Sequence, residues 1–457
     1  MDKFNDKNKK RRLLMLPFFA VMAVLTVVAF IIPLRPTQSY SEKRNLAQFP
    51  DFSTQALISG DYFDDISTWF SDTFPGREGW ISLAGTVESL HGINDVTIYG
   101  DLPQADAVPV VTTPRPAATP APLPEDSAVE EPIVMPEIKE TLPPEESVEQ
   151  WGGIEVDGDA EVIFGNVLQI GNSAFAYYGF SQQGADRYID MMNLCAEKLS
   201  QKGVEVYSVL APTSVGVMVA SEYMEMLGCT DQGQSISYML SGMSDKVNKV
   251  NAFNNLIAHN DEYIYYRTDH HWSALGAYYA YEEFCKTAGV SPAPLTDFEL
   301  WDQGLFKGSY YYNCKQNSKL EPDTVYAYDP GGNIEMKITA AEGNTFPWPL
   351  LTDMSASNDG SKYMVFLAGD HPMTQITNHD IPEGKSCVVI KDSFGNPFIP
   401  FLTKNYHKIY VLDYRSYTGM KLSAFTEAYE IDDVIFVGSL AMAQSTGTIS
   451  LLENITR

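Results

Sequence analysis

The stretch TDHHWS, residues 268–273, is the starting point for reading this chain, because it places a carboxylate and an imidazole two residues apart in front of a new helix. In an extended segment, Asp269 and His271 project to the same side. An aspartate that holds one ring nitrogen of a histidine leaves the other nitrogen as a general base, which is half of a nucleophilic triad. The pattern therefore predicts a nucleophile elsewhere in the chain.

The second informative stretch is KDSFGNP, residues 391–397, which follows a β-rich run at 387–390. A serine in the turn at the carboxyl end of a strand suits a nucleophile, because the following backbone N–H groups can face a developing oxyanion. Ser393 is therefore the candidate nucleophile, with Asn396 and Phe394 as oxyanion or substrate candidates. The alternative is that Asp392 or Ser393 only caps a helix.

A metal site is the competing interpretation of the histidine pair. Asp269, His270 and His271 offer metal-type ligands, but a metal centre normally needs a third or fourth ligand from elsewhere. The residues that could complete such a centre are His371, His379 and Asp380. The combination of an Asp-x-His at one strand end with a serine at another favours the triad, so we expect no metal and no other cofactor.

The sequence pattern of residues 156–457 is typical of an α/β domain, in which β-rich runs alternate with amphipathic helical patterns. The expected strands are 204–210, 363–367, 387–390, 409–412 and 434–437, and the expected helices are 188–202 and 274–287. This alternation predicts a mostly parallel sheet covered by helices on both faces. Ligands of such sheets bind beyond the carboxyl ends of the strands, where the candidate residues fall.

The apolar run at residues 13–34 contains no charged residue and is close to the roughly 20 residues that cross a bilayer core. The basic residues of 9–12 precede it and fewer follow closely, so the positive-inside rule predicts a cytoplasmic tail, 1–12, and an external remainder. A cleaved signal peptide is the alternative, but the run is longer than an ordinary h-region and no small-x-small site follows. We expect an uncleaved, single-pass anchor in the cell membrane with an extracellular catalytic domain.

Two segments separate the anchor from the catalytic domain, 156–457. Residues 35–100 show apolar residues at helical spacing and are expected to pack on the main domain. Residues 101–155 are rich in proline and acidic residues and bury too little apolar surface to offset their ordering entropy. They are therefore expected to form a disordered insert.

Charge and cysteine content exclude several partners. A formal net charge of −28 argues against nucleic acid or an anionic lipid surface, since both reward positive charge. The five cysteines show no CxxC pair and no regular spacing, so neither a zinc knuckle nor a disulfide scaffold is predicted. One pair could still form a disulfide, which would leave at least one thiol.

These motifs together resemble the DHHW protein family, whose name spells residues 269–272. The segments EKRNL at 42–46, FPGR at 74–77 and KDSF at 391–394 share in the resemblance, so it covers nearly all of the chain after the anchor except the proline-rich insert. The family is SGNH-hydrolase-like, which implies a three-layer αβα fold, and is distantly similar to alginate O-acetyltransferases. The insert departs from the family pattern, so we infer that it loops out of one domain.

The resemblance implies roles for the residues of the two motifs. Ser393 corresponds to the nucleophile, His271 to the general base and Asp269 to the group that orients it. His270 falls on the variable position between them. Trp272 is expected to pack the loop, with a substrate platform as the alternative.

The implied activity is transfer of an acetyl group to a cell-surface polysaccharide, with acyl groups supplied by a membrane-bound O-acyltransferase as partner. Tyr310, in the aromatic cluster 306–313, is a further substrate candidate. Two alternatives remain open at this point. The chain could be a carbohydrate esterase of the same mechanism, or a non-catalytic glycan-binding protein of the cell envelope.

Overall fold

The computed structural model describes residues 35, 38–39, 44–50, 52–53, 61–74, 96–99, 105–109, 167–220, 224, 227–314 and 317–457. The expected anchor at 13–34 lies outside these residues, as does the expected insert at 101–155 apart from 105–109. Within the described residues, no helix combines the length and apolar character that a membrane span requires. The anchor and the insert therefore stay predictions.

The chain divides into two compact units, Met1–Gly92 with Lys315–Ser318 and Ile93–Cys314 with Lys319–Arg457. The described elements of the first unit are β1 (Gln38–Ser39), β2 (Arg44–Asn45) and α3 (Asp61–Asp72). Strands β1 and β2 pair antiparallel, and the Asp72 carboxylate accepts the Ala47 N–H at 2.8 Å. The helical spacing seen in the sequence corresponds to α3, while packing of 35–100 on the main domain stays a prediction.

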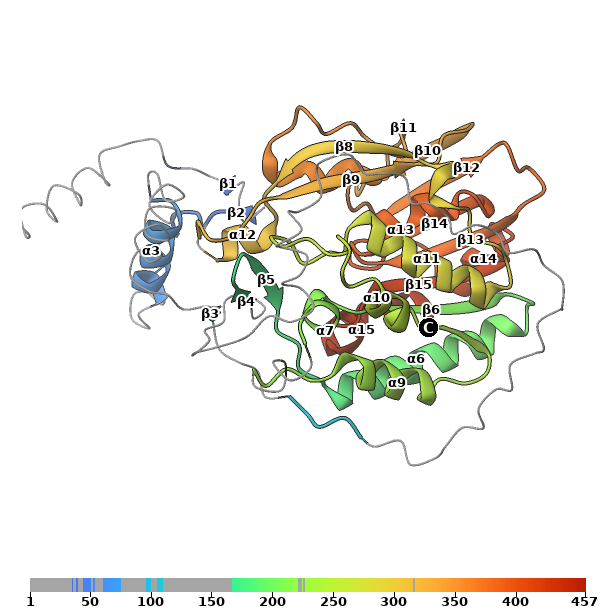
Figure 1. The fold of residues 1–457 in the computed structure, drawn as a ribbon, viewed down its shortest axis with the longest axis horizontal. Helices are drawn as coiled ribbons and strands as arrows, with labels where there is room; N and C mark the ends of the chain where they lie inside the picture. The colour runs from blue at the N-terminus through green and yellow to red at the C-terminus, as the bar shows by residue number, and fades with distance from the viewer. Residues whose placement is uncertain are drawn as a thin grey trace, which may run out of the picture. The chain divides into compact units, whose positions relative to one another are not determined.

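The second unit is built on an eight-stranded sheet within the described residues, in the order β11-β10-β12-β14-β13-β15-β6-β7 (Figure 1). In that order the strands are β11 (Thr345–Trp348), β10 (Ile334–Thr339), β12 (Met373–Asn378), β14 (Tyr406–Asp413), β13 (Lys385–Lys391), β15 (Asp433–Ser439), β6 (Glu205–Ala211) and β7 (Val247–Val250). The strands from β14 to β7 are parallel neighbours, as the sequence predicts for this part of the sheet.

The expectation of a mostly parallel sheet is nevertheless wrong, because the sheet is mixed. Strands β12, β10 and β11 continue it from β14 in antiparallel pairs. The turn at 340–344 joins β10 to β11 and is too short for the crossover of about a dozen or more residues that a parallel pair needs. A hairpin forms there instead.

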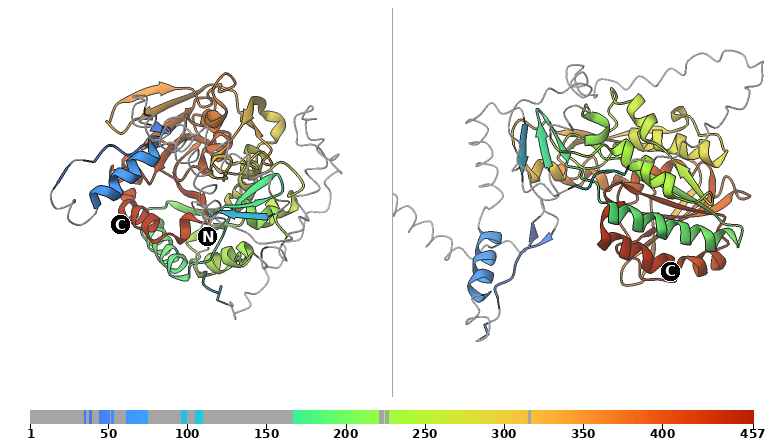
Figure 2. Two further views of the ribbon diagram at one scale, coloured as in Figure 1. Left: turned by 90° about the vertical axis from the view of Figure 1, so that its left-hand side faces the viewer. Right: turned by 90° about the horizontal axis from the view of Figure 1, so that it is seen from below.

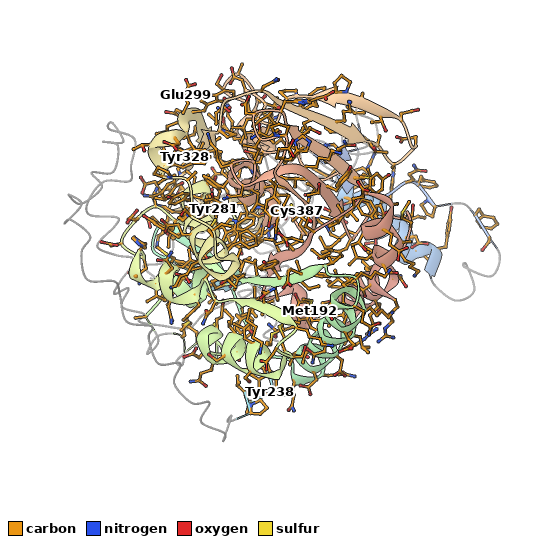
Figure 3. The ribbon with its side chains drawn as sticks, turned by 90° about the vertical axis from the view of Figure 1, so that its right-hand side faces the viewer. Met192, Tyr238, Tyr281, Glu299, Tyr328 and Cys387 are labelled. Atoms are coloured by element: carbon orange, nitrogen blue, oxygen red, sulfur yellow. The ribbon has the colours of Figure 1, made fainter. Side chains whose placement is uncertain are left out.

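Helices lie on both faces of the sheet, as the right-hand view of Figure 2 shows for α6 (Gln182–Ser200) and α11 (Ala274–Ala288). Consecutive side chains of β6 contact the two layers. The Tyr207 ring lies 5.1 Å from Phe284 of α11, whereas the Ser208 hydroxyl lies 3.4 Å from the Tyr188 hydroxyl of α6. In Figure 3, Cys387, Tyr281 and Met192 mark side chains of the buried core from β13, α11 and α6.

Helix α11 begins where the sequence predicts, because Ser273 caps it. The Ser273 hydroxyl accepts the Gly276 N–H at 3.3 Å and donates to the Tyr263 carbonyl at 2.7 Å. The helix ends at Ala288 and is capped by Gly289, whose left-handed φ of 71° favours glycine. The cap therefore ties the start of α11 to the loop that carries the histidine pair.

Smaller elements surround the sheet. Strands β3 (Val96–Tyr99), β4 (Val167–Ile170) and β5 (Ser173–Ala176) form an antiparallel sheet, and β8 (Glu299–Phe306) pairs with β9 (Asp323–Asp329). The remaining helices are α7 (Ser214–Met218), α9 (Gln232–Gly242), α10 (Phe253–Ala258), η1 (Leu295–Asp297), α12 (Ser309–Asn313), η2 (Asp359–Val365), α13 (Gly395–Leu402), α14 (Leu422–Ala428), η3 (Met442–Gln444) and α15 (Thr446–Thr456).

The strand expected at 363–367 is wrong, since residues 363–365 form the end of η2, Phe366 makes only an isolated bridge with Leu351, and Leu367 lies in a turn. Leu367 and Ala368 have positive φ angles of 55° and 56°, which an extended strand does not allow. A short apolar run of this kind does not distinguish a strand from a helical turn by its periodicity.

All five cysteines are free and buried, so the disulfide that the sequence left open does not form within the described residues, which include every cysteine. Burial raises the pKa of the Cys229 thiol to about 11 and those of Cys195, Cys285 and Cys314 to about 12. The thiols are therefore protonated and shielded at neutral pH.

We predict that iodoacetamide modifies none of the five cysteines rapidly in the native protein. In denaturant without a reducing agent, all five should be alkylated, because no disulfide protects any of them. Intact-protein mass spectrometry counts the adducts. Fewer than five adducts after unfolding, rising to five on reduction, would show a disulfide and contradict the structure.

Candidate functional site

Ser393 lies in the turn between β13 and α13, at the carboxyl edge of the parallel strands. Asp392 fixes this turn, because its carboxylate accepts the Phe394 N–H and, from the end of β15, the Ser439 N–H, both at 2.9 Å. Burial raises the pKa of Asp392, and the two N–H donors favour its charged form. The candidate nucleophile thus sits where parallel sheets place their ligands.

Asp269 and His271 lie on a bend and not in an extended segment at a strand end, which corrects the expectation. Tyr265 and Trp272 flank the bend as an isolated antiparallel bridge. The Asp269 Oδ1 atom accepts the His271 N–H at 3.1 Å, a local turn contact that aspartate makes readily. The side chains meet because the chain reverses, not because of strand alternation.

The three side chains of the two motifs form one hydrogen-bonded series. Asp269 Oδ1 lies 2.6 Å from His271 Nδ1, and His271 Nε2 lies 2.7 Å from Ser393 Oγ. Asp269 and His271 are both buried. With the carboxylate on Nδ1, the other ring nitrogen faces the serine hydroxyl, which is the geometry of a Ser-His-Asp site.

Asp269 is held in its ionised form. Burial opposes ionisation, but the charges of His270 and His271, the hydrogen bond to His271 and the Ser309 N–H at 2.8 Å outweigh it. Together they hold the pKa of the carboxyl well below its usual range. A charged carboxylate at Nδ1 fixes the orientation of the imidazole.

Asp323 of β9 anchors the loop that carries this pair, and sequence reasoning missed it. Its carboxylate accepts the Arg267 N–H and the Thr268 N–H, each at 2.8 Å, and the Tyr263 hydroxyl at 2.5 Å. Burial raises the pKa of Asp323, while these donors favour its charge. Thr268 lies 55 residues away along the chain, so no local pattern could have marked the contact.

His270 is half-exposed beside the series. Its Nδ1 lies 2.9 Å from Ser309 Oγ and 3.5 Å from Asp269 Oδ1, and its ring centroid lies 3.7 Å from that of His271. The donor atoms of Asp269, His270 and His271 fall within 4.8 Å of one another, close enough for a metal ion. Both ring nitrogens of His271 are already hydrogen-bonded, to Asp269 and to Ser393, so a metal ion bound to His271 would replace one of these two contacts.

The residues considered as further metal ligands do not join this group among the described residues. His379 and Asp380 follow the end of β12. Strand β12 runs antiparallel to β14, and Thr377 near the end of β12 pairs with Lys408 near the start of β14. The end of β12 therefore lies at the edge of the sheet opposite Ser393. His371 precedes β12, and burial lowers its pKa. The arrangement suits proton transfer better than metal coordination.

Two of the substrate candidates pack around the site. Trp272 is fully buried and donates from Nε1 to the Phe394 carbonyl at 2.9 Å, so it joins the histidine loop to the nucleophile turn and cannot be a substrate platform. The Phe394 ring is buried, with its centroid 5.2 Å from that of His271. Both side chains hold the site together.

The other two candidates point elsewhere. Asn396 is buried, and one N–H of its amide donates to Asp370 Oδ1 at 3.0 Å, which turns the amide toward Asp370. Tyr310 is buried in a small cluster with residues of β4 and β5. The structure therefore does not bring either side chain to Ser393 as a hydrogen-bond donor.

The backbone N–H groups that follow Ser393 are also used, which corrects their expected oxyanion role. Phe394 donates to the Asp392 carboxylate, Gly395 to the Asp392 carbonyl at 3.0 Å and Asn396 to the Ser393 carbonyl at 3.2 Å. These bonds shape the turn that presents the serine hydroxyl. They leave the stabilisation of an oxyanion to other groups.

A charged cluster borders the turn on the side of β14. Lys391 is fully buried, and its Nζ contacts Asp370 at 2.5 Å and Asp413 at 3.0 Å. Arg415 lies 2.8 Å from Asp370 and also pairs with Asp413. Burial opposes ionisation of Asp370, but Lys391 and Arg415 hold its pKa well below its usual range. Two carboxylates thus balance the two cations.

The fold and the site define an α/β protein with a Ser-His-Asp hydrogen-bonded series at the carboxyl edge of its sheet. The chain belongs to the DHHW protein family, whose model matches residues 42–114 and 148–412. A DHHW family protein from Eubacterium siraeum DSM 15702 is 26% identical with a TM-score of 0.56, covering 64% of this chain and 95% of that one. No curated protein matches the chain.

Two further solved structures are similar at lower identity. Bacillus cereus PatB1 with a sulfonyl adduct is 18% identical with a TM-score of 0.54, covering 62% of this chain and 97% of that one. The O-acetyltransferase domain of Pseudomonas putida AlgJ is 13% identical with a TM-score of 0.34, covering 62% of this chain and 96% of that one. The likeness to PatB1 supports the fold.

We predict that Gly308→Ala destabilises the protein by displacing Asp269. A Cβ atom at position 308 would lie 2.2 Å from Asp269 Cβ and 2.6 Å from the Thr268 carbonyl oxygen, so the loop must shift. The expected loss is about 1–3 kcal/mol in the free energy of unfolding, measured by denaturant titration.

Gly447→Ala in α15 is the control for this substitution. A Cβ atom there meets only Ser445 Oγ at 3.8 Å, an ordinary contact, and alanine favours a helix over glycine, so the variant should be at least as stable as the wild type. Equal stability of Gly308→Ala and Gly447→Ala would contradict the close packing of Gly308 against Asp269.

Proposed function

We propose that this chain is an extracytoplasmic O-acyltransferase that transfers an acetyl group to a cell-envelope polysaccharide through Ser393, His271 and Asp269. The observation that carries the proposal is the hydrogen-bonded series of these side chains at the carboxyl edge of the sheet. In this proposal, the apolar run at 13–34 anchors the chain in the cell membrane with the catalytic domain outside the cell.

The first half of the reaction forms an acyl-enzyme. Ser393 Oγ attacks the acyl carbonyl carbon while His271 Nε2 accepts the hydroxyl proton, and Asp269 stabilises the resulting imidazolium. The imidazolium then gives its proton to the oxygen of the leaving group as the bond from the acyl carbon to that oxygen breaks. The acyl group remains as an ester on Ser393.

The second half transfers the acyl group to the acceptor. A sugar hydroxyl gives its proton to His271 Nε2 and attacks the ester carbonyl, and Ser393 leaves and recovers the proton. A membrane-bound O-acyltransferase partner would supply the acyl groups across the membrane. If water enters in place of the sugar hydroxyl, the same residues perform the reaction of a carbohydrate esterase.

An aryl sulfonyl fluoride tests the nucleophile, and the choice of reagent follows the sulfonyl adduct in the PatB1 structure. We predict stoichiometric labelling of the full-length protein at Ser393, located by peptide mass spectrometry. Ser393→Ala should abolish it, and His271→Gln should slow it by about 10²–10⁴-fold because the general base is lost. Ser416→Ala, which removes an exposed hydroxyl after β14, should label normally.

The outcomes of this experiment separate the proposed enzyme from the alternatives. No labelling of the wild type, or labelling that persists in Ser393→Ala, would count against a catalytic Ser393 and favour a non-catalytic glycan-binding protein. When Ser393 is labelled, an acetyl-ester reporter with an oligosaccharide acceptor distinguishes transfer, which yields acetylated sugar, from hydrolysis, which yields acetate.

We also predict that Asp269→Asn lowers kcat for the reporter by about 10³–10⁴-fold with little change in KM. An amide in place of the carboxylate would donate to His271 Nδ1 and leave a proton on Nε2, the wrong tautomer for accepting the serine proton. Steady-state kinetics on the full-length protein give both constants. The control is Asp245→Asn, at a side chain that is 93% exposed, and similar losses in both variants would contradict the role of Asp269.

A further inference from the structure

Tyr363 of η2 touches both partners of the Ser393–His271 pair. Its ring stacks on the His271 ring, with centroids 4.0 Å apart and planes at 12°. Its hydroxyl donates to the Ser393 carbonyl oxygen at 2.9 Å. One side chain, only 8% exposed, therefore joins the loop that carries the imidazole to the turn that carries the hydroxyl.

We propose that Tyr363 is a positioning residue for acyl transfer, which holds the plane of the His271 ring and the backbone of Ser393 in a fixed relation. The proposal rests on the proposed function of this pair. Nothing in the chemistry requires Tyr363 to touch the substrate, so its effect is exerted through the two residues that do.

The stacked ring supplies a restraint that the hydrogen bonds of His271 do not. Those bonds hold the imidazole at Nδ1 and Nε2, which leaves the ring able to tilt about the line through the two nitrogens. A flat aromatic face at 4.0 Å opposes this tilt. The same face attracts the positive imidazolium that forms while Ser393 attacks, as aromatic rings attract cations generally.

The hydroxyl acts on the other partner. The Ser393 carbonyl also accepts the Asn396 N–H, so the Tyr363 hydroxyl adds a second restraint on the peptide that follows the nucleophile. Burial, followed by the charges of Tyr266, Asp269, Asp370 and Asp392, raises the pKa of Tyr363 well above its ordinary value. The hydroxyl therefore keeps its proton and remains a donor.

Tyr363 is itself held in place from several sides. Its ring makes edge contacts with Phe366 at 5.4 Å and with Tyr266 at 6.2 Å. The Thr352 N–H donates to the Val365 carbonyl at 2.9 Å, which fixes the end of η2. Because Tyr363 is itself held in place, it can restrain the His271 ring and the Ser393 carbonyl that it contacts.

The test compares Tyr363→Phe, Tyr363→Leu and Tyr266→Phe in the full-length protein. Sulfonylation of Ser393 is followed over a range of reagent concentrations to separate the rate constant from the affinity for the reagent. Tyr363→Leu should lower the rate constant by about 10²-fold, the cost of a misplacement near 1 Å, and leave affinity unchanged. Tyr363→Phe keeps the stack and should recover most of this loss.

Tyr266→Phe is the matched control. Tyr266 is a buried neighbour whose hydroxyl has no hydrogen-bond partner among the described residues, so removing the hydroxyl should leave the rate unchanged. Circular dichroism gives the folded fraction of each variant. A rate loss in Tyr363→Leu that matches its loss of folded protein, or the absence of any rate loss, would overturn the proposal and leave the proposed function standing.

A second measurement does not depend on activity. The proton between His271 Nδ1 and Asp269 gives a low-field NMR signal when the two groups are held in a short hydrogen bond, and selective histidine labelling assigns it. The signal should persist in Tyr363→Phe and shift or broaden in Tyr363→Leu. An unchanged signal in Tyr363→Leu would overturn the positioning role, whereas failure of the wild type to label at Ser393 would overturn the proposed function.

Discussion

The contact between Asp269 Oδ1 and His271 Nδ1, at 2.6 Å, is the interaction on which the arrangement of the site depends. It selects which ring nitrogen faces Ser393, and it requires a buried carboxylate to stay charged. A buried charge of this kind persists only when neighbouring donors compensate its desolvation. Here the His271 N–H and the Ser309 N–H do so, which is why Gly308 must approach Asp269 without a side chain.

Two other buried carboxylates extend the same principle to the backbone. Asp323 collects N–H groups of the histidine loop, and Asp392 collects N–H groups of the nucleophile turn and of the end of β15. Each accepts backbone N–H groups that have no partner from regular secondary structure, so the polar backbone of these loops is satisfied. The site is thus assembled from loops whose shape is set by fixed acceptors.

Between these two anchored loops lie the groups that join them. Trp272 reaches from the histidine loop to the Phe394 carbonyl, and Tyr363 reaches from η2 to both His271 and the Ser393 carbonyl. Such contacts suit a proton transfer that tolerates little displacement. They also explain why aromatic residues near the site are buried and do not form an exposed platform for sugars.

The sequence by itself determined the local elements and the chemistry-bearing motifs. Strands β13, β14 and β15 and helix α11 follow from apolar runs and a serine cap, and the sequence places Asp269 and His271 two residues apart, although they meet through a bend and not through strand alternation. Only the tertiary structure decided the mixed sheet and the partners Asp323 and Tyr363. These depend on contacts between residues 55 and 30 positions apart, as for Asp323 with Thr268 and Tyr363 with Ser393, which no local periodicity records.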